Sequence, residues 1–359
     1  MQLVECVPNF SEGRDRQTID AIAKAITSVP DVHLLDVDAN ISANRTVMTF
    51  VGGPKPASLA AFRAIEKAQA LINMEKHQGE HPRIGATDVC PFVPLSGCTM
   101  EECVGLSVEL AERIGKELQI PVYLYAQSAR SQERIRLAFI RQGQYERLAQ
   151  RMKDGFLPDY GPESFNPVSG ATAVGARNLL IAFNVNLSAD SKAIAQDIAL
   201  LIRQARKENG GKEPLGLPSQ NPDAKGLDTE VDWTGCTSIG WYINEFRRAQ
   251  VSLNLMDYEK TPLHRAFLAI SQWAISHGSN VTGSEIVGLV PLKAMLDAGL
   301  FYLERLKAAD NCDEAKLIES ALEFLNLSDL KPFDPKRKIL DYRLKELCLP
   351  FSICREERQ

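Results

Sequence analysis

One pattern occurs twice in this 359-residue chain. Residues 3–11 (LVECVPNFS) form a largely apolar run that ends in Asn-Phe-Ser, and apolar residues then recur at helical spacing over residues 19–26. Residues 179–188 (LLIAFNVNLS) form a similar run that ends in Asn-Leu-Ser, and helical spacing follows over residues 194–202. A repeated order of strand, loop and helix indicates two copies of one unit, with a boundary near residues 178–182.

Each copy continues with a pair of strands and a second helix. In the first half, β-rich runs at residues 33–37 and 45–51 precede a helical segment at residues 56–72. The second half repeats this order, with β-rich runs at residues 238–243 and 250–256 before a further helical segment. Several strands are joined by short links, which favours antiparallel sheets with helices on one face over a doubly wound sheet.

The composition argues against several classes of protein. With 45% hydrophobic and 24% charged residues, the chain is typical of soluble globular proteins. A net charge of −5 and a pI near 5.7 argue against a surface for nucleic acid or anionic membranes, which needs a dominant basic field. No apolar stretch reaches the roughly 18–20 residues that span a bilayer, and the first residues lack a signal-peptide pattern. We therefore expect a cytoplasmic protein that contacts neither nucleic acid nor membrane.

Residues 79–94 (GEHPRIGATDVCPFVP) concentrate charged residues, glycines and prolines. The segment has neither a helical nor a strand period, which predicts a rigid, shaped loop. Its His81 titrates near neutrality, so this side chain can accept and return a proton in catalysis. The alternative is that His81 caps a turn and contacts only solvent.

Two patterns bear on metal binding. His77 and His81 belong to an H-x-x-E-H sequence, the inverted zinc-protease pattern, which needs a helix so that both histidines face one metal. Gly79 weakens such a helix by about 1 kcal/mol, and Pro82 biases His81 away from helical geometry. The eight cysteines include no CxxC pair. We therefore expect no metal site.

Charged residues mark the strands of the first half. Asp36 and Asp38 lie in the strand-like run at residues 34–38, and Arg45 begins the next strand. Charged residues at strand ends are commonly solvated or paired with each other. The functional alternative is that Asp38 faces a bound cation and Arg45 faces an anion.

Two segments predict loops. Residues 161–172 (GPESFNPVSGAT) suit a backbone-lined ligand loop in which Phe165 is available for stacking, or else an interdomain linker. Residues 208–232 are rich in glycine and proline, which predicts a long loop.

Many of these segments match the motifs of one family. They are CVPNFSEG at residues 6–13, LLDVDA at 34–39, NRTV at 44–47, GEHPR at 79–83, DVCPF at 88–92, PVYLY at 121–125, GP at 161–162, GATA at 170–173, GAR at 175–177, IAFN at 181–184, IGWY at 239–242 and GLVPLKA at 288–294. With them the chain resembles the glutamate formimidoyltransferases, including the transferase half of formimidoyltransferase-cyclodeaminase. The match runs from Cys6 to about Tyr342, nearly the whole chain.

The resemblance implies an α+β fold class: two tandem ferredoxin-like α/β subdomains, with sheets largely antiparallel and helices packed on one face. The N-terminal, catalytic subdomain would span residues 1–180 and the C-terminal subdomain residues 181–342, followed by a tail at residues 343–359. The family's catalytic histidine falls on His81. Its folate-contacting segment falls on ten residues of this chain, which are Gly161, Pro162, Glu163, Ser164, Phe165, Asn166, Pro167, Val168, Ser169 and Gly170.

The implied reaction moves the formimidoyl group of N-formimidoyl-L-glutamate to N5 of tetrahydrofolate, a step of histidine degradation and one-carbon metabolism. N5 loses a proton and the departing glutamate amine gains one, and His81 can do both in turn. Asp38 would hold the amidinium of the donor and orient His81, while Arg45 and Arg83 would bind the donor's carboxylates.

Further partners also follow from the resemblance. Tetrahydrofolate, carrying a polyglutamate tail, would be the co-substrate, the protein would form a homodimer, and the chemistry requires no metal. Two alternatives remain open at this point. One is folate-dependent formyl transfer from N-formylglutamate, in which oxygen replaces NH at the transferred carbon, and the other is a folate-binding protein without turnover.

Overall fold

The computed structural model describes residues 2–190, 192–207, 212–214 and 230–350. The chain divides into two compact units, one of residues 1–178 together with those from Leu344 onward, and one of residues 179–343. Each unit has its own sheet, a seven-stranded one in the first and a four-stranded one in the second. The predicted α+β class with two tandem subdomains is confirmed.

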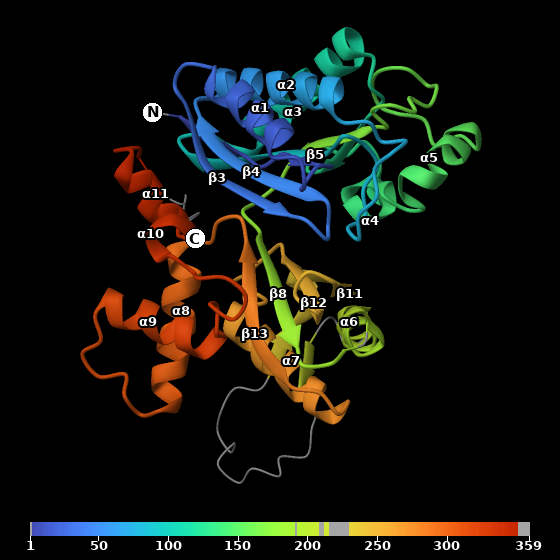
Figure 1. Ribbon diagram of the computed structural model, residues 1–359. Helices are drawn as coiled ribbons and strands as arrows, with labels where there is room; N and C mark the ends of the chain where they lie inside the picture. Colours follow the sequence, from blue (N-terminus) through green and yellow to red (C-terminus); the bar gives the residue numbers. More distant parts are fainter. Residues whose placement is uncertain (1, 191, 208–211, 215–229, 351–359) are drawn as a thin grey trace. The chain divides into compact units, whose positions relative to one another are not determined.

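The first unit is built on six elements in the order strand, helix, strand, strand, helix, strand. They are the broken strand β1 (Leu3–Cys6) and β2 (Asn9–Phe10), α1 (Arg16–Thr27), β3 (Val32–Asn40), β4 (Arg45–Gly52), α2 (Pro54–Leu71) and β5 (Thr87–Ser96). The broken strand pairs with β4 on one side and β5 on the other, and β3 pairs with β4 (Figure 1). All these pairings are antiparallel.

The second unit repeats this arrangement. Its elements are β8 (Ile181–Leu187), α6 (Lys192–Lys207), β11 (Cys236–Ile243), β12 (Arg248–Leu255), α7 (Leu263–Ser276) and β13 (Val281–Val287). The strand order β11-β12-β8-β13 matches the order β3-β4-β1/β2-β5 of the first unit, and every pairing is antiparallel. This is the ferredoxin-like order, so the duplication that the sequence predicts is present in the topology.

The first sheet continues beyond this common core. The added elements are α3 (Met100–Arg113), a π turn (Ile114–Leu118), β6 (Val122–Ala126), a 3-10 turn (Gln132–Ile135), α4 (Leu137–Ile140), α5 (Gln144–Lys153) and β7 (Thr172–Ala176). β7 lies between β5 and β6 and is parallel to both. A capping box begins α3, because Thr99 and Glu102 exchange side-chain and backbone hydrogen bonds.

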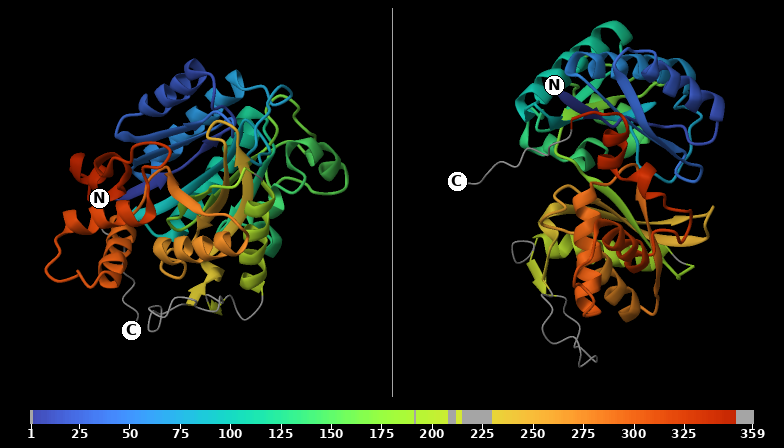
Figure 2. Two further views of the ribbon diagram at one scale, coloured as in Figure 1. Left: turned by 60° about the horizontal axis from the view of Figure 1, so that its bottom comes forward. Right: turned by 90° about the vertical axis from the view of Figure 1, so that its left-hand side faces the viewer.

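The helices of the first unit cover its sheet unequally. α1, α2 and α3 lie along one face (Figures 1 and 2) and enclose the larger apolar core, which includes Val4, Cys6 and Phe10. A smaller core with Tyr123 and Tyr125 lies under α4 and α5 on the opposite face, at the β6–β7 end. Because side chains alternate along a strand, Glu5 and Asn9 lie on this second face.

The prediction of one loop over residues 79–94 is wrong in its second half. Residues 79–86 are irregular, but Thr87–Ser96 forms β5, in which every residue except Pro94 is buried. A strand buried on both faces shows no polar alternation, and prolines argue against a central strand, so the usual signals were missing. The pairing of β5 with β7 ends at Phe92, before Pro94.

Helices complete the second unit and the end of the chain. They are α8 (Leu292–Arg305), α9 (Glu314–Leu325), α10 (Pro335–Lys338) and α11 (Leu340–Glu346). The predicted loop at residues 208–232 falls mostly outside the described residues. At its ends, β9 (Lys212–Pro214) and β10 (Glu230–Asp232) pair with each other, and a 3-10 turn (Trp233–Gly235) follows. Within the described part of the chain, no helix is both long and apolar enough to cross a membrane.

Candidate functional site

The structure joins two of the segments that the sequence singled out. Backbone hydrogen bonds run from Ala86 N to Ser169 O (2.9 Å) and from Ala171 N to Ile84 O (3.0 Å). Gly170 lies between them at φ +65°, and a Cβ added there would lie 2.2 Å from Ile84 O. Only glycine fits this position. The two hydrogen bonds hold the loop of residues 79–86, here called the histidine loop, edge to edge with the segment of residues 161–170.

The segment of residues 161–170 has an ordered end and an exposed part. Asn166 Oδ1 accepts hydrogen bonds from Val168 N (3.2 Å) and Ser169 N (3.1 Å). The Phe165 ring packs on Tyr145 at 5.4 Å between centroids, and the Tyr145 hydroxyl donates to Pro167 O (2.5 Å). Most of residues 161–168 remain exposed, so this part of the segment is accessible to a ligand.

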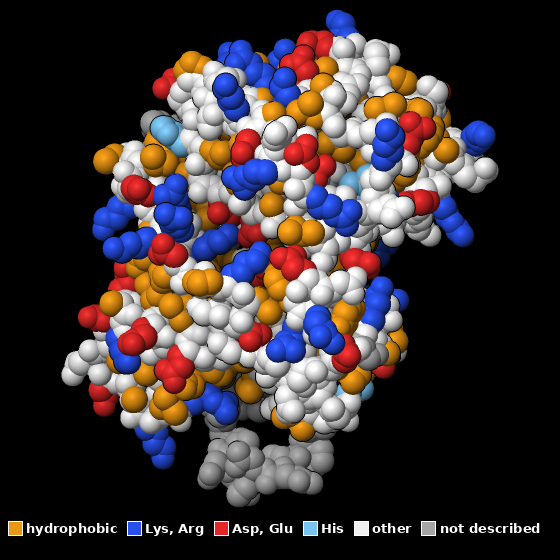
Figure 3. Space-filling view, viewed as in Figure 1, with side chains coloured by type: hydrophobic (Ala, Val, Ile, Leu, Met, Phe, Trp, Pro, Cys, Tyr) orange, Lys and Arg blue, Asp and Glu red, His pale blue; other side chains and the backbone are white. Residues whose placement is uncertain are grey.

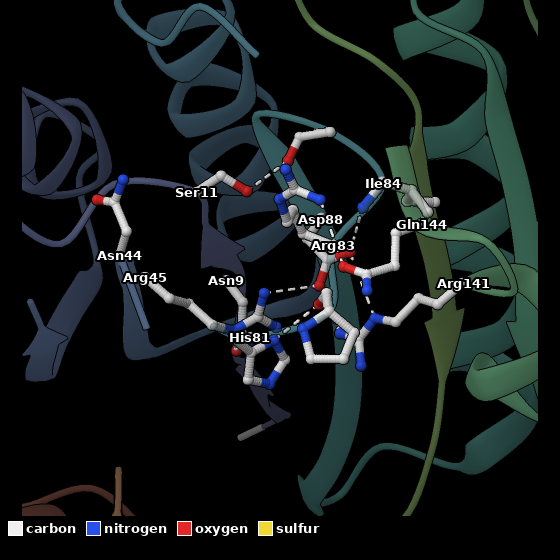
Figure 4. A network of polar contacts seen from close by, with 12 residues as sticks. Asn9, Ser11, Asn44, Arg45, His81, Arg83, Ile84, Asp88, Arg141 and Gln144 are labelled. Carbon is white, nitrogen blue, oxygen red and sulfur yellow. Dashed lines mark hydrogen bonds and ion pairs between the residues drawn. The ribbon is translucent and has the colours of Figure 1, made fainter. Parts of the chain in front are cut away.

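Asp88 is the centre of the polar network beside these segments (Figure 4). The carboxylate is fully buried and accepts hydrogen bonds from Arg45 Nη1 (2.7 Å), Arg141 Nη2 (2.5 Å) and Ile84 N (3.0 Å). Burial opposes ionisation, but the guanidiniums of Arg141 and Arg45 outweigh it and hold the pKa of Asp88 well below its usual range. Asp88 is therefore ionised at every physiological pH.

Two arginines share this one carboxylate, which leaves an excess of positive charge. Arg45 is 7% exposed, donates from Nε to Asn9 Oδ1 (3.1 Å), and has a pKa lowered to about 10 by burial. Arg141, at the end of α4, is 14% exposed. No described residue accepts a hydrogen bond from Nη2 of Arg45 or Nη1 of Arg141. Such donors in a poorly hydrated place favour an anionic ligand.

His81 stands beside this cluster in a half-buried position (Figure 4). Its Nδ1 lies 2.7 Å from Pro82 O, and because a carbonyl oxygen only accepts, Nδ1 carries the proton and donates. In the neutral ring the lone pair is then on Nε2. Burial, together with the charges of Arg45 and Arg141, holds the pKa of His81 well below its ordinary value. The imidazole is therefore neutral at pH 7 and can accept a proton.

Arg83 has contacts different from those of Arg45. Its two Nη groups donate to Glu146 at 2.8 and 2.6 Å, and Nε donates to His77 Nδ1 (3.1 Å). Further donations reach Gln144 Oε1 and His77 O, both at 3.3 Å, so all five N–H groups have acceptors. A substrate carboxylate would have to displace Glu146, which favours Arg83 as an anchor of the loop.

The H-x-x-E-H residues do not lie on a helix. Both ring nitrogens of His77 are used within the protein, because Nδ1 accepts from Arg83 and Nε2 donates to Asn44 O (2.9 Å). Among the described residues, no three His, Cys, Asp or Glu side chains come together as metal ligands would.

Asp38 lies on β3, half-buried and opposite Val47 of β4. The carboxylate that contacts Arg45 is Asp88, to which sequence reasoning gave no role. Arg141 was missed completely. A charged residue inside the apolar run of residues 87–93 was the one available signal for Asp88, because charged side chains are rarely fully buried without a partner.

Charges outside the network are mixed. On the face drawn in Figure 3, Lys and Arg side chains lie among Asp and Glu side chains over the described surface. This face shows no continuous patch of basic side chains of the kind that binds a nucleic-acid backbone.

Comparison with known proteins agrees with this architecture. A family model for the N-terminal subdomain of the formiminotransferase domain matches residues 3–177, and one for the formiminotransferase domain matches residues 182–345. The mouse (Mus musculus) formimidoyltransferase-cyclodeaminase is 46% identical over 342 residues, which is 95% of this chain and 60% of that protein. The chain thus spans about 60% of the length of such bifunctional relatives.

Two shorter relatives match over nearly their whole length. The glutamate formimidoyltransferase of Streptococcus pyogenes is 42% identical over 84% of this chain and 94% of its own. That of Thermoplasma acidophilum is 41% identical over 90% of this chain and 98% of its own. The resemblance inferred from the motifs is confirmed, and the chain belongs to the formiminotransferase family.

Proposed function

We propose that this chain transfers the formimidoyl group of N-formimidoyl-L-glutamate to N5 of tetrahydrofolate, giving 5-formimidoyltetrahydrofolate and L-glutamate. The names of the two shorter relatives support this reaction. The observation that carries it is the neutral His81, held through Nδ1 next to a cluster with excess positive charge. A base of this kind suits the attack of an amine on an amidine.

His81 moves the proton. As N5 attacks the amidine carbon, a new N–C bond forms and Nε2 of His81 takes the proton that N5 loses. The tetrahedral intermediate then collapses, the bond from carbon to the glutamate nitrogen breaks, and His81 returns the proton to the departing amine. Arg45 and Arg141 disfavour the imidazolium, so the return of the proton is favourable.

The charged residues hold the donor. Arg45 offers Nη2 to a carboxylate of the glutamate moiety, and Asp38 faces the amidinium. Arg83, which the sequence suggested as a second carboxylate ligand, instead keeps the histidine loop attached to Glu146 of α5.

Residues 161–170 bind the folate. The exposed residues of this segment, next to the histidine loop, suit the aminobenzoyl-glutamate part of tetrahydrofolate and its polyglutamate tail. The protein works as a homodimer in the cytoplasm and needs no metal for this chemistry.

The test is an assay of purified protein with tetrahydrofolate and each of two donors, N-formimidoylglutamate and N-formylglutamate. We expect turnover with the formimidoyl donor, because its amidinium gives Asp38 a cation to bind. Faster turnover of the formyl donor would replace the proposed reaction with formyl transfer. Tetrahydrofolate binding without turnover of either donor would make the chain a folate-binding protein.

A further inference from the structure

Glu5 occupies an unusual place for a carboxylate. It lies in the middle of the first sheet, with Val51 of β4 opposite on one side and Val93 of β5 on the other. Its neighbours Val4 and Cys6 belong to the core under α1–α3, so Glu5 points to the opposite face. Only 3% of the residue is exposed.

No described residue forms a hydrogen bond or ion pair with this carboxylate, and the only charge that acts on it among the causes of its pKa shift is that of Arg177. Other buried acids of the first unit are well satisfied: Asp88 accepts from two arginines and a backbone amide. Asp159, with a side chain 5% exposed, accepts from Arg134 and from Leu124 N. Buried polar groups nearly always have partners, so a carboxylate without one needs an explanation.

The positive charge of Arg177 stabilises the ionised form of Glu5 only in part. Its charge acts on Glu5, but the two form no ion pair, and Arg177 Nη1 donates to Asn178 O (2.9 Å). Burial raises the pKa of Glu5 to about 7 even though the charge of Arg177 opposes the shift. The Glu5 oxygens are not among the polar atoms that are both closed off from solvent and without a partner, so water or a ligand can supply their hydrogen bonds.

A carboxylate in this position is suited to one kind of ligand. Its two oxygens accept side by side and match two parallel N–H donors on a planar edge, as a guanidinium provides. The 2-amino group and N3–H of a pterin ring form such an edge. We propose that Glu5 binds this edge of the tetrahydrofolate pterin, an inference that rests on folate being the co-substrate.

The strand positions of Glu5 and of Asn9, which bonds the Arg45 that lies beside His81 (Figure 4), suit the order of groups in tetrahydrofolate. Asn9, which holds Arg45, pairs with Val89, and Glu5 pairs with Val93 four residues along β5. Four strand residues span about 13 Å. A bicyclic ring and two side chains bridge such a distance, with the 2-amino edge at Glu5 and N5 at His81. The tail beyond N5 then continues toward residues 161–170, which are hydrogen-bonded to the histidine loop.

The test combines one variant with one altered ligand. Binding of tetrahydrofolate, and of an analogue whose 2-amino group is replaced by methyl, is measured for the wild type and for Glu5→Gln. We expect the wild type to prefer tetrahydrofolate by about 10- to 100-fold, the range for hydrogen bonds to a charged group. Glu5→Gln should lose most of this preference, and its KM for the glutamate donor should stay unchanged. Glu101→Gln, an exposed acid in the first turn of α3, is the matched control.

Three results would overturn the proposal. Equal binding of both ligands by the wild type would overturn the proposal. This result needs no variant, so the test is valid even if Glu5→Gln does not fold. Equal loss of affinity for both ligands in Glu5→Gln would make the role of Glu5 structural, and unchanged binding would give it no role. In each case the wild type still turns over the donor, so the proposed transferase function survives. A wild type that neither binds nor uses tetrahydrofolate would remove both proposals.

Discussion

At the scale of single residues, His81 combines a fixed proton on Nδ1 with a lowered pKa. We expect His81→Ala to fold and to bind tetrahydrofolate normally but to lose at least about 100-fold in kcat, the lower range for general acid-base catalysis. Steady-state assays against His33→Ala, a half-buried histidine on β3, provide the comparison. A variant that keeps most of its kcat would exclude His81 as the proton carrier.

Arg141 supplies the second positive charge around Asp88. Arg141→Met leaves Asp88 bound by Arg45 and Ile84 N, so the fold should persist with one balanced ion pair. The excess charge disappears, and we expect KM for the glutamate donor to rise about 10-fold or more. The control Arg147→Met changes an exposed arginine of α5. An unchanged KM would show that the cluster does not bind the donor.

Glu5 makes stability depend on pH. Its pKa rises from 4.5 to about 7 on folding, so the folded chain holds a proton that the unfolded chain releases. The stability present below pH 4.5 is therefore lost as the pH rises to about 7, by about 3 kcal/mol for a shift of this size. Urea unfolding of wild type and Glu5→Gln should show a stability difference that grows in favour of the variant between pH 5 and pH 8. A difference independent of pH would contradict the buried, unpartnered state of Glu5.

At the scale of elements, the contact between the histidine loop and residues 161–170 depends on Gly170. In Gly170→Ala, the new Cβ overlaps Ile84 O, and the φ of +65° is itself unfavourable for alanine. We expect a loss of more than about 2 kcal/mol in unfolding free energy and weaker folate binding. Gly278→Ala is matched in φ, at +71°, but nothing lies within 4 Å of its Cβ. It should lose only about 1 kcal/mol. Equal losses in the two variants would mean that the loop contact adds nothing.

The same scale shows what the sequence could predict. The common core was predictable because apolar spacing repeats in both halves. β5 was not, because a strand buried on both faces loses its alternation, and the parallel neighbour β7 gave no local signal. His81 was visible from its chemistry. Asp88 and Arg141 depend on a contact across 53 residues of sequence that no local pattern reports.

The two copies of the fold carry different polar residues at equivalent positions. Asn9 and Asn186 hold the same place in the two copies, but Asn9 binds Arg45 and Asn186 binds Asp329 and Gln250. The first unit carries the arginines, Asp88 and His81. In the second, the equivalent position belongs to a network of amides and carboxylates. One topology thus supports two different polar faces.

At the scale of the whole molecule, each unit has its own apolar core, yet the first unit includes residues from Leu344 onward. A fragment of residues 1–178 therefore lacks part of its own unit, and residues 179–359 lack His81, Arg45 and Asp88. We expect each fragment to be inactive. A chain that joins residues 1–178 directly to residues 344–359 should be more stable than residues 1–178 alone. It should still not turn over, because the glutamate formimidoyltransferases of Streptococcus pyogenes and Thermoplasma acidophilum align across both units.

Thermal unfolding and the formimidoyl-transfer assay on these three chains separate stability from function. If the joined chain gains stability without turnover, the second unit contributes directly to activity. Full turnover by the joined chain would place all of the catalytic and binding residues in the first unit. The second copy of the fold would then contribute only to stability or assembly.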